Sequence, residues 1–220
     1  MIVIVDYGLG NLRSVQKGLA RVGYEAEISD DPRLLEKADG VVLPGVGAFG
    51  DCYQGLADRG LVEPVKAAAL SGRPFLGICV GLQLLFDGSE ESLDSPGLGL
   101  IAGRVVRFPE ARETGLKVPH MGWNKLIPTP GVDNPLLKGV SNAPYAYFVH
   151  SYYAQPEDDA VILARCEYGK PFAAMVGRGN LFAVQFHPEK SQADGLSILR
   201  AFGELASNGA KSQQGPIQPR

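Results

Sequence analysis

A cysteine stands between two glycines where an apolar strand pattern gives way to a helical one. In the stretch RPFLGICVGLQLLF, residues 73–86, Gly77 and Gly81 lie two positions before and after Cys79. A sharp strand-to-helix turn exposes its central side chain, and the first N–H groups of the following helix stabilise negative charge beside it. Small residues relieve the crowding of such a turn. The spacing therefore predicts a nucleophilic thiolate at Cys79, with the N–H of Val80 as an oxyanion donor.

A histidine and a glutamate late in the chain supply the base that a thiol nucleophile needs. His187 follows the apolar run LFAVQF, and Glu189 comes two residues later. Residues two apart in an extended chain share a face, so Glu189 can accept a hydrogen bond from the imidazole and orient it toward Cys79. Cys79, His187 and Glu189 are therefore a candidate triad of nucleophile, base and orienting residue.

Each of these patterns also has a simpler interpretation. Free cysteines are often buried, so Cys79 can be an inert core thiol, and His-Pro-Glu can be an ordinary surface turn. Taken singly, neither pattern favours chemistry over these alternatives. Their occurrence together in one chain of alternating strands and helices does favour it. Cys52 and Cys166 lack the strand-to-helix setting and are predicted to be inert core thiols.

A second glycine-rich segment, PGVG at residues 44–47, follows another predicted strand. It should therefore lie at the same carboxyl edge of the sheet as Cys79. Backbone N–H groups of Gly45, Val46 and Gly47 can face a developing oxyanion there. The alternative is a plain strand-to-helix turn. A phosphate-binding loop is excluded, because the Gly-Lys-Ser/Thr ending of that motif is missing.

Strands and helices alternate in the part of the chain that must position these residues. The runs IVIVDYG, YEAEI, DGVVLPG and PFLGI have the pattern of strands. Between them, residues 12–22 form an amphipathic helix that Asn11 can cap, and residues 51–70 form a second helical stretch. This alternation predicts an α/β fold with an open, mixed, mostly parallel sheet flanked by helices.

After Phe86 the pattern changes to short strands. They are predicted around RVVRF, YAYFVHSYYA, AVILARCEYG, PFAAMVGRG and NLFAVQFH. These runs predict antiparallel hairpins in the C-terminal half, with a turn at GRGN. A last helix reaches about Leu205, and Ser191 with Asp194 suggests a capping box at its start.

The composition limits the classes of function. The chain has 220 residues, 45% of them hydrophobic, and a net charge of -3, so no basic excess points to nucleic acid or an anionic membrane. No apolar stretch is long enough to span a bilayer. The cysteines and histidines lack the spacing of a metal site, no dinucleotide fingerprint occurs, and no cofactor is expected. Few cysteines, odd in number, favour a reducing cytoplasm. We expect one domain over residues 1–207 and a disordered tail over 208–220.

The same motifs occur together in a known family. GICVGLQLLF, PGVGAFGD and QFHPEKS resemble the class I (triad) glutamine amidotransferases, over nearly the whole chain to about residue 205. DYGLGNLRSV, PHMGWN and YFVHSYY are similar, more narrowly, to the glutaminase subunits of imidazole glycerol phosphate synthases. The resemblance implies the flavodoxin-like fold of the class I glutamine amidotransferases and a heterodimer with a (β/α)₈ cyclase subunit.

The reaction that this resemblance implies belongs to histidine biosynthesis. Glutamine is hydrolysed to glutamate and ammonia. The ammonia then passes through a channel to the cyclase, which forms imidazole glycerol phosphate and an aminoimidazole carboxamide ribonucleotide. Glutamine hydrolysis is expected to be nearly silent until the partner is bound and loaded. A peptide flip in the loop of Gly45, Val46 and Gly47, which in the family can point a carbonyl into the site, would explain that low basal activity.

The resemblance also assigns roles to further residues. Glutamine binding is expected of Gln83, Glu91 and the backbone of His150, Ser151 and Tyr152. The partner interface and ammonia exit are expected at Met121, Trp123, Asn124, Tyr147 and Lys190. Simpler interpretations stand beside these roles: a helix-face amide for Gln83, a structural histidine for His150, a solvated lysine for Lys190, and core filling on a predicted loop for Met121 and Trp123.

Three other functions stay open on the sequence alone. The first is a triad glutaminase that serves another synthase, and the segments HMGWN and DYGLGN disfavour this alternative. The second is a stand-alone γ-glutamyl peptidase or other thiol hydrolase with the same cysteine, histidine and glutamate. The third is a partner-binding module with an inactive site, which the presence of all three residue types of the triad disfavours.

Overall fold

Eight strands form the central sheet of the computed structural model, which describes residues 1–109 and 115–209. In chain order they are β1 (Ile2–Val5), β2 (Ala26–Ser29), β3 (Gly40–Gly45), β4 (Phe75–Cys79), β9 (Ile127–Pro128), β12 (Ile162–Tyr168), β13 (Lys170–Arg178) and β14 (Leu181–Val184). Across the sheet the order is β2-β1-β3-β4-β14-β13-β12-β9. The first five strands in this order, β2, β1, β3, β4 and β14, pair in parallel with their neighbours. The pairs formed by β14 with β13, β13 with β12, and β12 with β9 are antiparallel. The predicted open, mixed, mostly parallel sheet is confirmed.

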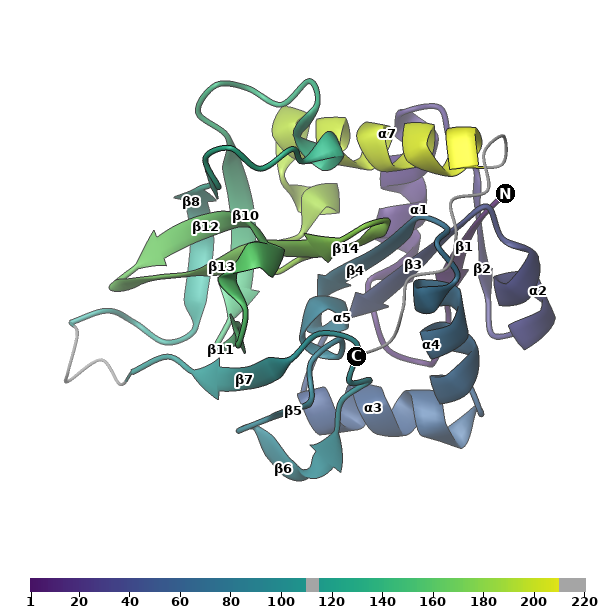
Figure 1. Ribbon diagram of the computed structural model, residues 1–220, viewed down its shortest axis with the longest axis horizontal. Coiled ribbons are helices and arrows are strands. Elements are labelled where there is room, and N and C mark those ends of the chain that lie inside the picture. Colours follow the sequence, from purple (N-terminus) through teal and green to yellow (C-terminus); the bar gives the residue numbers. More distant parts are fainter. Residues whose placement is uncertain (110–114, 210–220) are drawn as a thin grey trace.

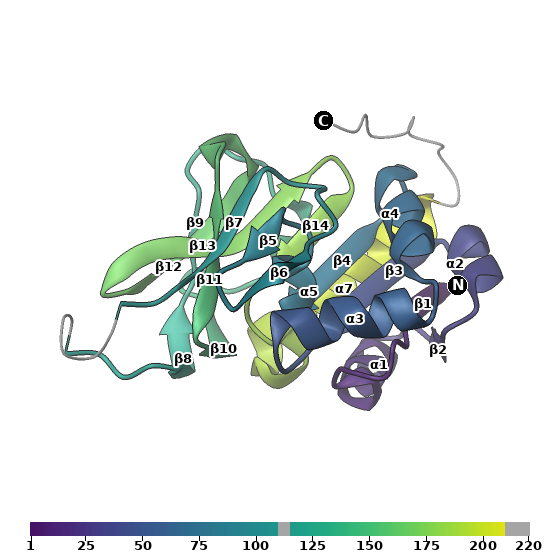
Figure 2. The ribbon, with the colours of Figure 1, turned by 90° about the horizontal axis from the view of Figure 1, so that it is seen from below.

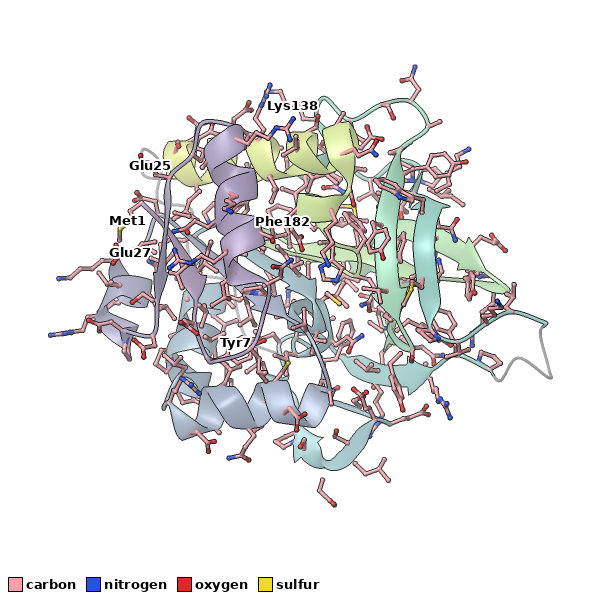
Figure 3. The ribbon with its side chains drawn as sticks, turned by 180° about the vertical axis from the view of Figure 1, so that it is seen from behind. Met1, Tyr7, Glu25, Glu27, Lys138 and Phe182 are labelled. Carbon is pink, nitrogen blue, oxygen red and sulfur yellow. The ribbon has the colours of Figure 1, made fainter. Side chains whose placement is uncertain are left out.

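Helices cover both faces of the parallel part of the sheet (Figure 1). They are α1 (Leu12–Arg21), α2 (Pro32–Lys37), α3 (Phe49–Asp58), α4 (Val62–Leu70), α5 (Val80–Gln83) and α7 (Gln192–Gly209). Figures 1 and 2 show α1 and α7 on one face and α3 and α4 on the other, and Figure 3 shows α1 and α7 from behind. Every residue of β1, β3, β4 and β14 is buried, which explains their continuous apolar sequences.

Two smaller sheets lie beside the antiparallel end of the central sheet (Figure 2). Strands β5 (Gly88–Ser89), β6 (Ser92–Pro96), β7 (Gly103–Arg107) and β11 (Tyr152–Pro156) form one, and β8 (His120–Lys125) and β10 (Tyr145–His150) form the other. The predicted hairpin at GRGN is also confirmed. Arg178 of β13 pairs with Leu181 of β14, and Gly179 makes the turn with a φ of 60°.

The prediction of one helical stretch over residues 51–70 is wrong, because this segment forms two separate helices, α3 and α4. Gly60, with a φ of 64°, lies between them, and its N–H donates to the carbonyl of Ala57. A glycine in this left-handed conformation is a common way to end a helix. The helix after Cys79 is also short, since α5 ends at Gln83 and continues only as turns.

Two segments of the C-terminal half differ from their predictions. YAYFVHSYYA, predicted as one strand, is divided at Ser151 into β10 and β11, which belong to different sheets. PHMGWN, predicted as a loop, contains most of β8, which pairs with β10 in antiparallel register. Both differences arise from long-range pairing, and together they bring His120 opposite His150.

The predicted helix caps are not formed as expected. The side chain of Asn11 makes no capping hydrogen bond at the start of α1. Ser191 and Asp194 do not form a capping box, because the Asp194 carboxylate accepts hydrogen bonds from Ser141 and Tyr145, and the Ser191 hydroxyl donates to the His187 carbonyl. Most of the tail predicted over 208–220 lies outside the described residues. Among the described helices, none is long and apolar enough to cross a membrane.

Candidate active site

Cys79 occupies a strained turn between β4 and α5. It has φ 56° and ψ -111°, a backbone conformation that residues other than glycine rarely adopt. Such strain persists only where the surrounding structure enforces it, and it is concentrated at functional sites. The side chain is almost fully buried, with 4% of the residue exposed.

The glycines around Cys79 are required by close backbone approaches. A Cβ on Gly81 would lie 1.9 Å from the carbonyl oxygen of Leu43, and a Cβ on Gly77 would lie 2.7 Å from the carbonyl oxygen of Gly81. Neither contact is possible for a real side chain. The strand, the turn and the neighbouring strand β3 therefore fit together only with glycine at both positions, as the spacing predicts.

His187 and Glu189 lie beyond the end of β14, the strand next to β4 in the sheet. The Nδ1 of His187 donates to Oε1 of Glu189 at 2.9 Å, and the two side chains are 3% and 0% exposed. Oε2 of Glu189 is buried and has no hydrogen-bond partner among the described residues. The Nδ1 bond leaves Nε2 as the ring nitrogen of His187 that is free to interact with Cys79.

The electrostatics of the site favour a charged imidazole. Burial lowers the pKa of His187, but hydrogen bonds to Cys79 and Glu189 outweigh it and raise the pKa to about 9. His187 is therefore an imidazolium at neutral pH. A cation beside a cysteine sulfur stabilises the thiolate, which is the nucleophilic form.

A cavity of about 350 Å³ opens beside Cys79, a volume in the range of small-molecule sites. Ten of the predicted site residues line it: Val46, Gly47, Cys79, Val80, Gln83, Glu91, His150, Ser151, Tyr152 and His187. Pro119 and Val149 complete the lining. The cavity thus has one wall from the parallel strands and another from the junction of β10 and β11.

The glycine-rich loop lies next to Cys79, because Gly45 at the end of β3 pairs with that residue. Val46 and Gly47 line the cavity, whereas Gly45 packs under the turn, where its Cβ would lie 2.8 Å from the Gly81 nitrogen. Two buried side chains bind the loop. The Tyr7 hydroxyl (labelled in Figure 3) donates to the Pro44 carbonyl at 2.6 Å, and the thiol of Cys52, fully buried, donates to the Val46 carbonyl at 3.4 Å.

The polar side chains expected to bind glutamine already have protein partners. Nε2 of Gln83 donates to the Tyr152 carbonyl at 3.1 Å and to Oε1 of Gln185 at 3.2 Å. Oε2 of Glu91 accepts from the N–H of Phe49 at 2.8 Å, at the start of α3. These bonds hold both side chains in place at the cavity wall.

His150 pairs with His120 behind the cavity. The Nδ1 of His150 bonds to the Tyr152 carbonyl at 2.8 Å, and its Nε2 lies 3.1 Å from Nδ1 of His120. Burial lowers the pKa of His120 to about 4 and that of His150 to about 3. Both rings are therefore neutral, so His150 is a structural histidine that also lines the cavity. Among the described residues, no group of three or more histidine, cysteine or acidic side chains could hold a metal ion.

Four of the five residues expected at the partner interface form an outward-facing group. Met121 is 62% exposed and Trp123 is 46% exposed. The Trp123 ring lies 6.0 Å from the ring of Tyr147, and Nζ of Lys190 lies 5.9 Å from the same Tyr147 ring. The side chain of Asn124 instead turns inward, where its Nδ2 lies 3.2 Å from Nε2 of His120 and donates to the Glu167 carbonyl at 2.8 Å.

Gln185 was not found by sequence reasoning. It is fully buried, and its Nε2 lies 3.9 Å from the sulfur of Cys79. A signal existed, because Gln185 is the one polar residue in the apolar run before His187 and shares a face with it. Tyr7 was also missed as a site residue, and nothing local in the sequence connects it to the loop at residue 44.

Comparison with known proteins agrees with this geometry. Residues 3–204 match the glutamine amidotransferase class-I family. The chain is 56% identical over 209 residues to "Imidazole glycerol phosphate synthase subunit HisH" of Syntrophotalea carbinolica, covering 93% of this chain and 100% of that protein. It is 53% identical over 207 residues to the protein of the same name from Geobacter sulfurreducens, covering 93% and 98%.

The fold is shared with solved structures as well. A structure described as "Crystal structure of glutamine amidotransferase" matches with a TM-score of 0.71 at 22% identity, covering 94% of this chain and 100% of that chain. At that identity the match shows the fold alone. The family match and the high identity over nearly the full length show more: this chain belongs to the class I glutamine amidotransferases and, within them, to the HisH subunits of imidazole glycerol phosphate synthase.

Proposed function

We propose that the chain hydrolyses L-glutamine to glutamate and ammonia at Cys79, and that it supplies the ammonia to the cyclase subunit of an imidazole glycerol phosphate synthase in histidine biosynthesis. The observation that carries this proposal is the buried Cys79 on a strained turn beside a cavity, with the bonded pair of His187 and Glu189 at the end of the neighbouring strand. The relatives' shared name supports the choice of synthase. The three cysteines are free and buried, which supports a cytoplasmic setting.

The first half of the reaction forms a thioester. The Cys79 thiolate attacks the side-chain amide carbon of glutamine, and the carbonyl becomes an oxyanion. The imidazolium of His187 donates its Nε2 proton to the leaving nitrogen, the C–N bond breaks, and ammonia departs. Because the pKa of His187 is raised to about 9, the proton that the leaving group needs is present at neutral pH.

The second half of the reaction releases glutamate. The now neutral His187 takes a proton from water, the water oxygen attacks the thioester carbon, and the C–S bond breaks. The second proton of the water stays with the new carboxyl group and is released to solvent, so the products are glutamate, that proton, the Cys79 thiolate and the His187 imidazolium. Glu189 keeps the same imidazole tautomer throughout, because its carboxylate accepts the Nδ1 proton.

The proposed site also needs groups that bind the oxyanion and groups that bind glutamine. We assign the oxyanion to the N–H of Val80 and to an N–H of the Gly45, Val46 and Gly47 loop, which lies beside Cys79. We assign glutamine binding to Gln83, Glu91 and the segment from His150 to Tyr152, all of which line the cavity.

The partner is proposed to bind the group of Met121, Trp123, Tyr147 and Lys190, with Asn124 beside it. Exposed aromatic and methionine side chains suit the centre of a protein interface. This face is also connected to the catalytic residues. The N–H of His187 donates to the carbonyl of Tyr147 at 3.0 Å, so the strand that carries the aromatic group directly supports the base.

Glutamate release in the presence and absence of a cyclase subunit tests this function. We expect strong hydrolysis only when the chain, the cyclase and the nucleotide substrate of the cyclase are mixed. Trp123→Ala should weaken binding of the cyclase by about 30-fold, as for an aromatic residue at the centre of an interface. Leu93→Ala is the matched control, because Leu93 is 77% exposed on β6, away from this face.

Two results would contradict the proposal. Equal rates of glutamate release with and without the cyclase would reject the coupled synthase and indicate a stand-alone hydrolase. Equal binding by Trp123→Ala and Leu93→Ala would place the interface elsewhere.

A further inference from the structure

The orientations of two buried amides beside Cys79 follow from the hydrogen bonds around them. The Tyr152 carbonyl can only accept, so the amide atom of Gln83 that faces it at 3.1 Å must be Nε2. The second hydrogen of that nitrogen points to Gln185 at 3.2 Å, so the atom of Gln185 facing it must be the oxygen. Nε2 of Gln185 is then the atom that lies 3.9 Å from the sulfur of Cys79.

The Tyr152 carbonyl, where this series of hydrogen bonds begins, is held in place by a second donor. It also accepts from Nδ1 of His150 at 2.8 Å, which makes Nε2 of that neutral ring an acceptor. His120 must then donate from its Nδ1 and accept at its Nε2, where Nδ2 of Asn124 lies at 3.2 Å. Every donor and acceptor from Asn124 to Tyr152 is therefore determined, and the Tyr152 oxygen is bound from two sides.

Burial makes this arrangement hard to change. Gln185 is 0% exposed and Gln83 is 3% exposed, and an unpaired amide at such depth is costly. Rotating the Gln185 amide would place its NH₂ group against the NH₂ group of Gln83 and its oxygen against the sulfur. The observed orientation instead presents an N–H donor to Cys79, and such a donor bonds more strongly to a thiolate than to a thiol.

We propose that Gln185 is a positioning residue for glutamine hydrolysis. It donates a hydrogen bond that holds the Cys79 thiolate in place, and it fixes the amide of Gln83. With both N–H groups of Gln83 bonded to the protein, Oε1 is the amide atom left to accept a hydrogen bond from a donor group of the substrate in the cavity that Gln83 lines. This inference rests on the proposed function, because it takes Cys79 as the nucleophile.

Other groups also act on the sulfur and must be kept constant in any test. His187, beyond β14, bonds to it and is itself held by Glu189; Tyr7, after β1, and Cys52, on α3, also interact with it; and His150 and Glu91 line the same cavity. Substitutions confined to Gln185 leave all of these in place.

Two variants of Gln185 separate its two bonds. Gln185→Glu keeps an acceptor for Gln83 and replaces the donor to Cys79 with a negative charge, whereas Gln185→Met removes both. Gln54→Met, on the exposed side of α3, is the matched control. The first measurement is the rate at which iodoacetamide alkylates Cys79 between pH 5 and pH 9, followed by peptide mapping so that Cys52 and Cys166 are scored apart. The second is kcat and KM for glutamine in the assembled synthase.

The proposal predicts a different result for each variant. Both Gln185 variants should move the midpoint of the Cys79 alkylation profile upward by about one pH unit and lower kcat about tenfold. KM should rise several-fold in Gln185→Met and stay near the wild-type value in Gln185→Glu, which still holds Gln83. Gln54→Met should match the wild type in every measurement.

Alkylation profiles of both Gln185 variants that coincide with the wild type would overturn the proposal, and so would equal KM changes in the two variants. Circular dichroism and a melting curve show whether each variant is folded. If Gln185→Met does not fold, the nearly isosteric Gln185→Glu alone decides through its alkylation profile. A wild-type chain with no glutaminase activity in the synthase would instead reject the proposed function, so the two failures are distinguishable.

Discussion

At the residue scale, the site is defined by what surrounds one sulfur. Cys79 has a strained backbone, an imidazolium on one side and the N–H of Gln185 on another. The sequence predicted the triad because its members carry local signals, a glycine-flanked turn and a strand-end His-x-Glu. It did not predict Gln185 as a site residue, because the contacts that define its role come from β4, α5 and β11, and only the fold brings these together.

The ionisation of His187 gives a prediction at this scale. In the wild type, histidine ring signals in NMR should show one titration, with a pKa of about 9, between pH 5 and pH 10, because His120 and His150 titrate at about 4 and about 3. In Glu189→Gln the carboxylate is lost while burial still opposes the charge, so the pKa of His187 should fall by at least one unit. Glutamate release should fall by at least about 100-fold.

The same shift predicts how stability depends on pH. The folded-state pKa of His187 lies above the ordinary 6.5, so its stabilisation is fully present below pH 6.5 and is lost as the pH rises through about 9. Urea unfolding at pH 6 and pH 9.5 should show that the free energy of unfolding falls more between these pH values for the wild type than for Glu189→Gln. A wild-type His187 that titrates below pH 7, or equal losses in the two proteins, would contradict the ion pair.

At the element scale, the site depends on the carboxyl ends of three adjacent parallel strands, β3, β4 and β14. Their continuous apolar sequences predicted them correctly, because both faces of each strand are buried. The exposed or half-exposed elements were harder. The sequence of β8 contains glycine and asparagine and looks like a loop, and its strand conformation comes from pairing with β10, which no local pattern indicates.

The close packing of β3 against the turn gives a prediction at the element scale. Gly81→Ala would place a methyl group 1.9 Å from the Leu43 carbonyl oxygen, so β3 and the turn must move apart. We expect the free energy of unfolding to fall by about 2 kcal/mol, as for other overpacked sites. Glutamate release should fall about 100-fold, because the thiolate is displaced from His187.

Gly88→Ala is the matched control for this change. A Cβ at Gly88 would have its nearest contact at 3.6 Å, an ordinary van der Waals distance, so stability and activity should stay close to the wild type. Denaturant unfolding and glutamate release measure both effects. Gly81→Ala with wild-type activity would show that the geometry of the turn does not control the nucleophile.

At the scale of the whole molecule, the two halves of the chain have different tasks. The parallel half supplies Cys79, the proposed nucleophile, and the antiparallel half supplies the opposite cavity wall and the exposed aromatic group (Figures 1 and 2). β10 belongs to both tasks, since it carries Tyr147 on the outer face and His150 at the cavity. A partner bound at the exposed group would therefore act on a strand that is bonded directly to the backbone of His187.

The central claim is that glutamine is hydrolysed through a covalent bond to Cys79. The most direct measurement is to mix the assembled synthase with glutamine, quench it in acid within the first turnovers, and map the peptides of this chain by mass spectrometry. The account predicts a γ-glutamyl adduct on the peptide that contains Cys79, none on those containing Cys52 or Cys166, and neither adduct nor glutamate release in Cys79→Ala. Glutamate release that persists in Cys79→Ala, or an adduct only on another residue, would contradict it.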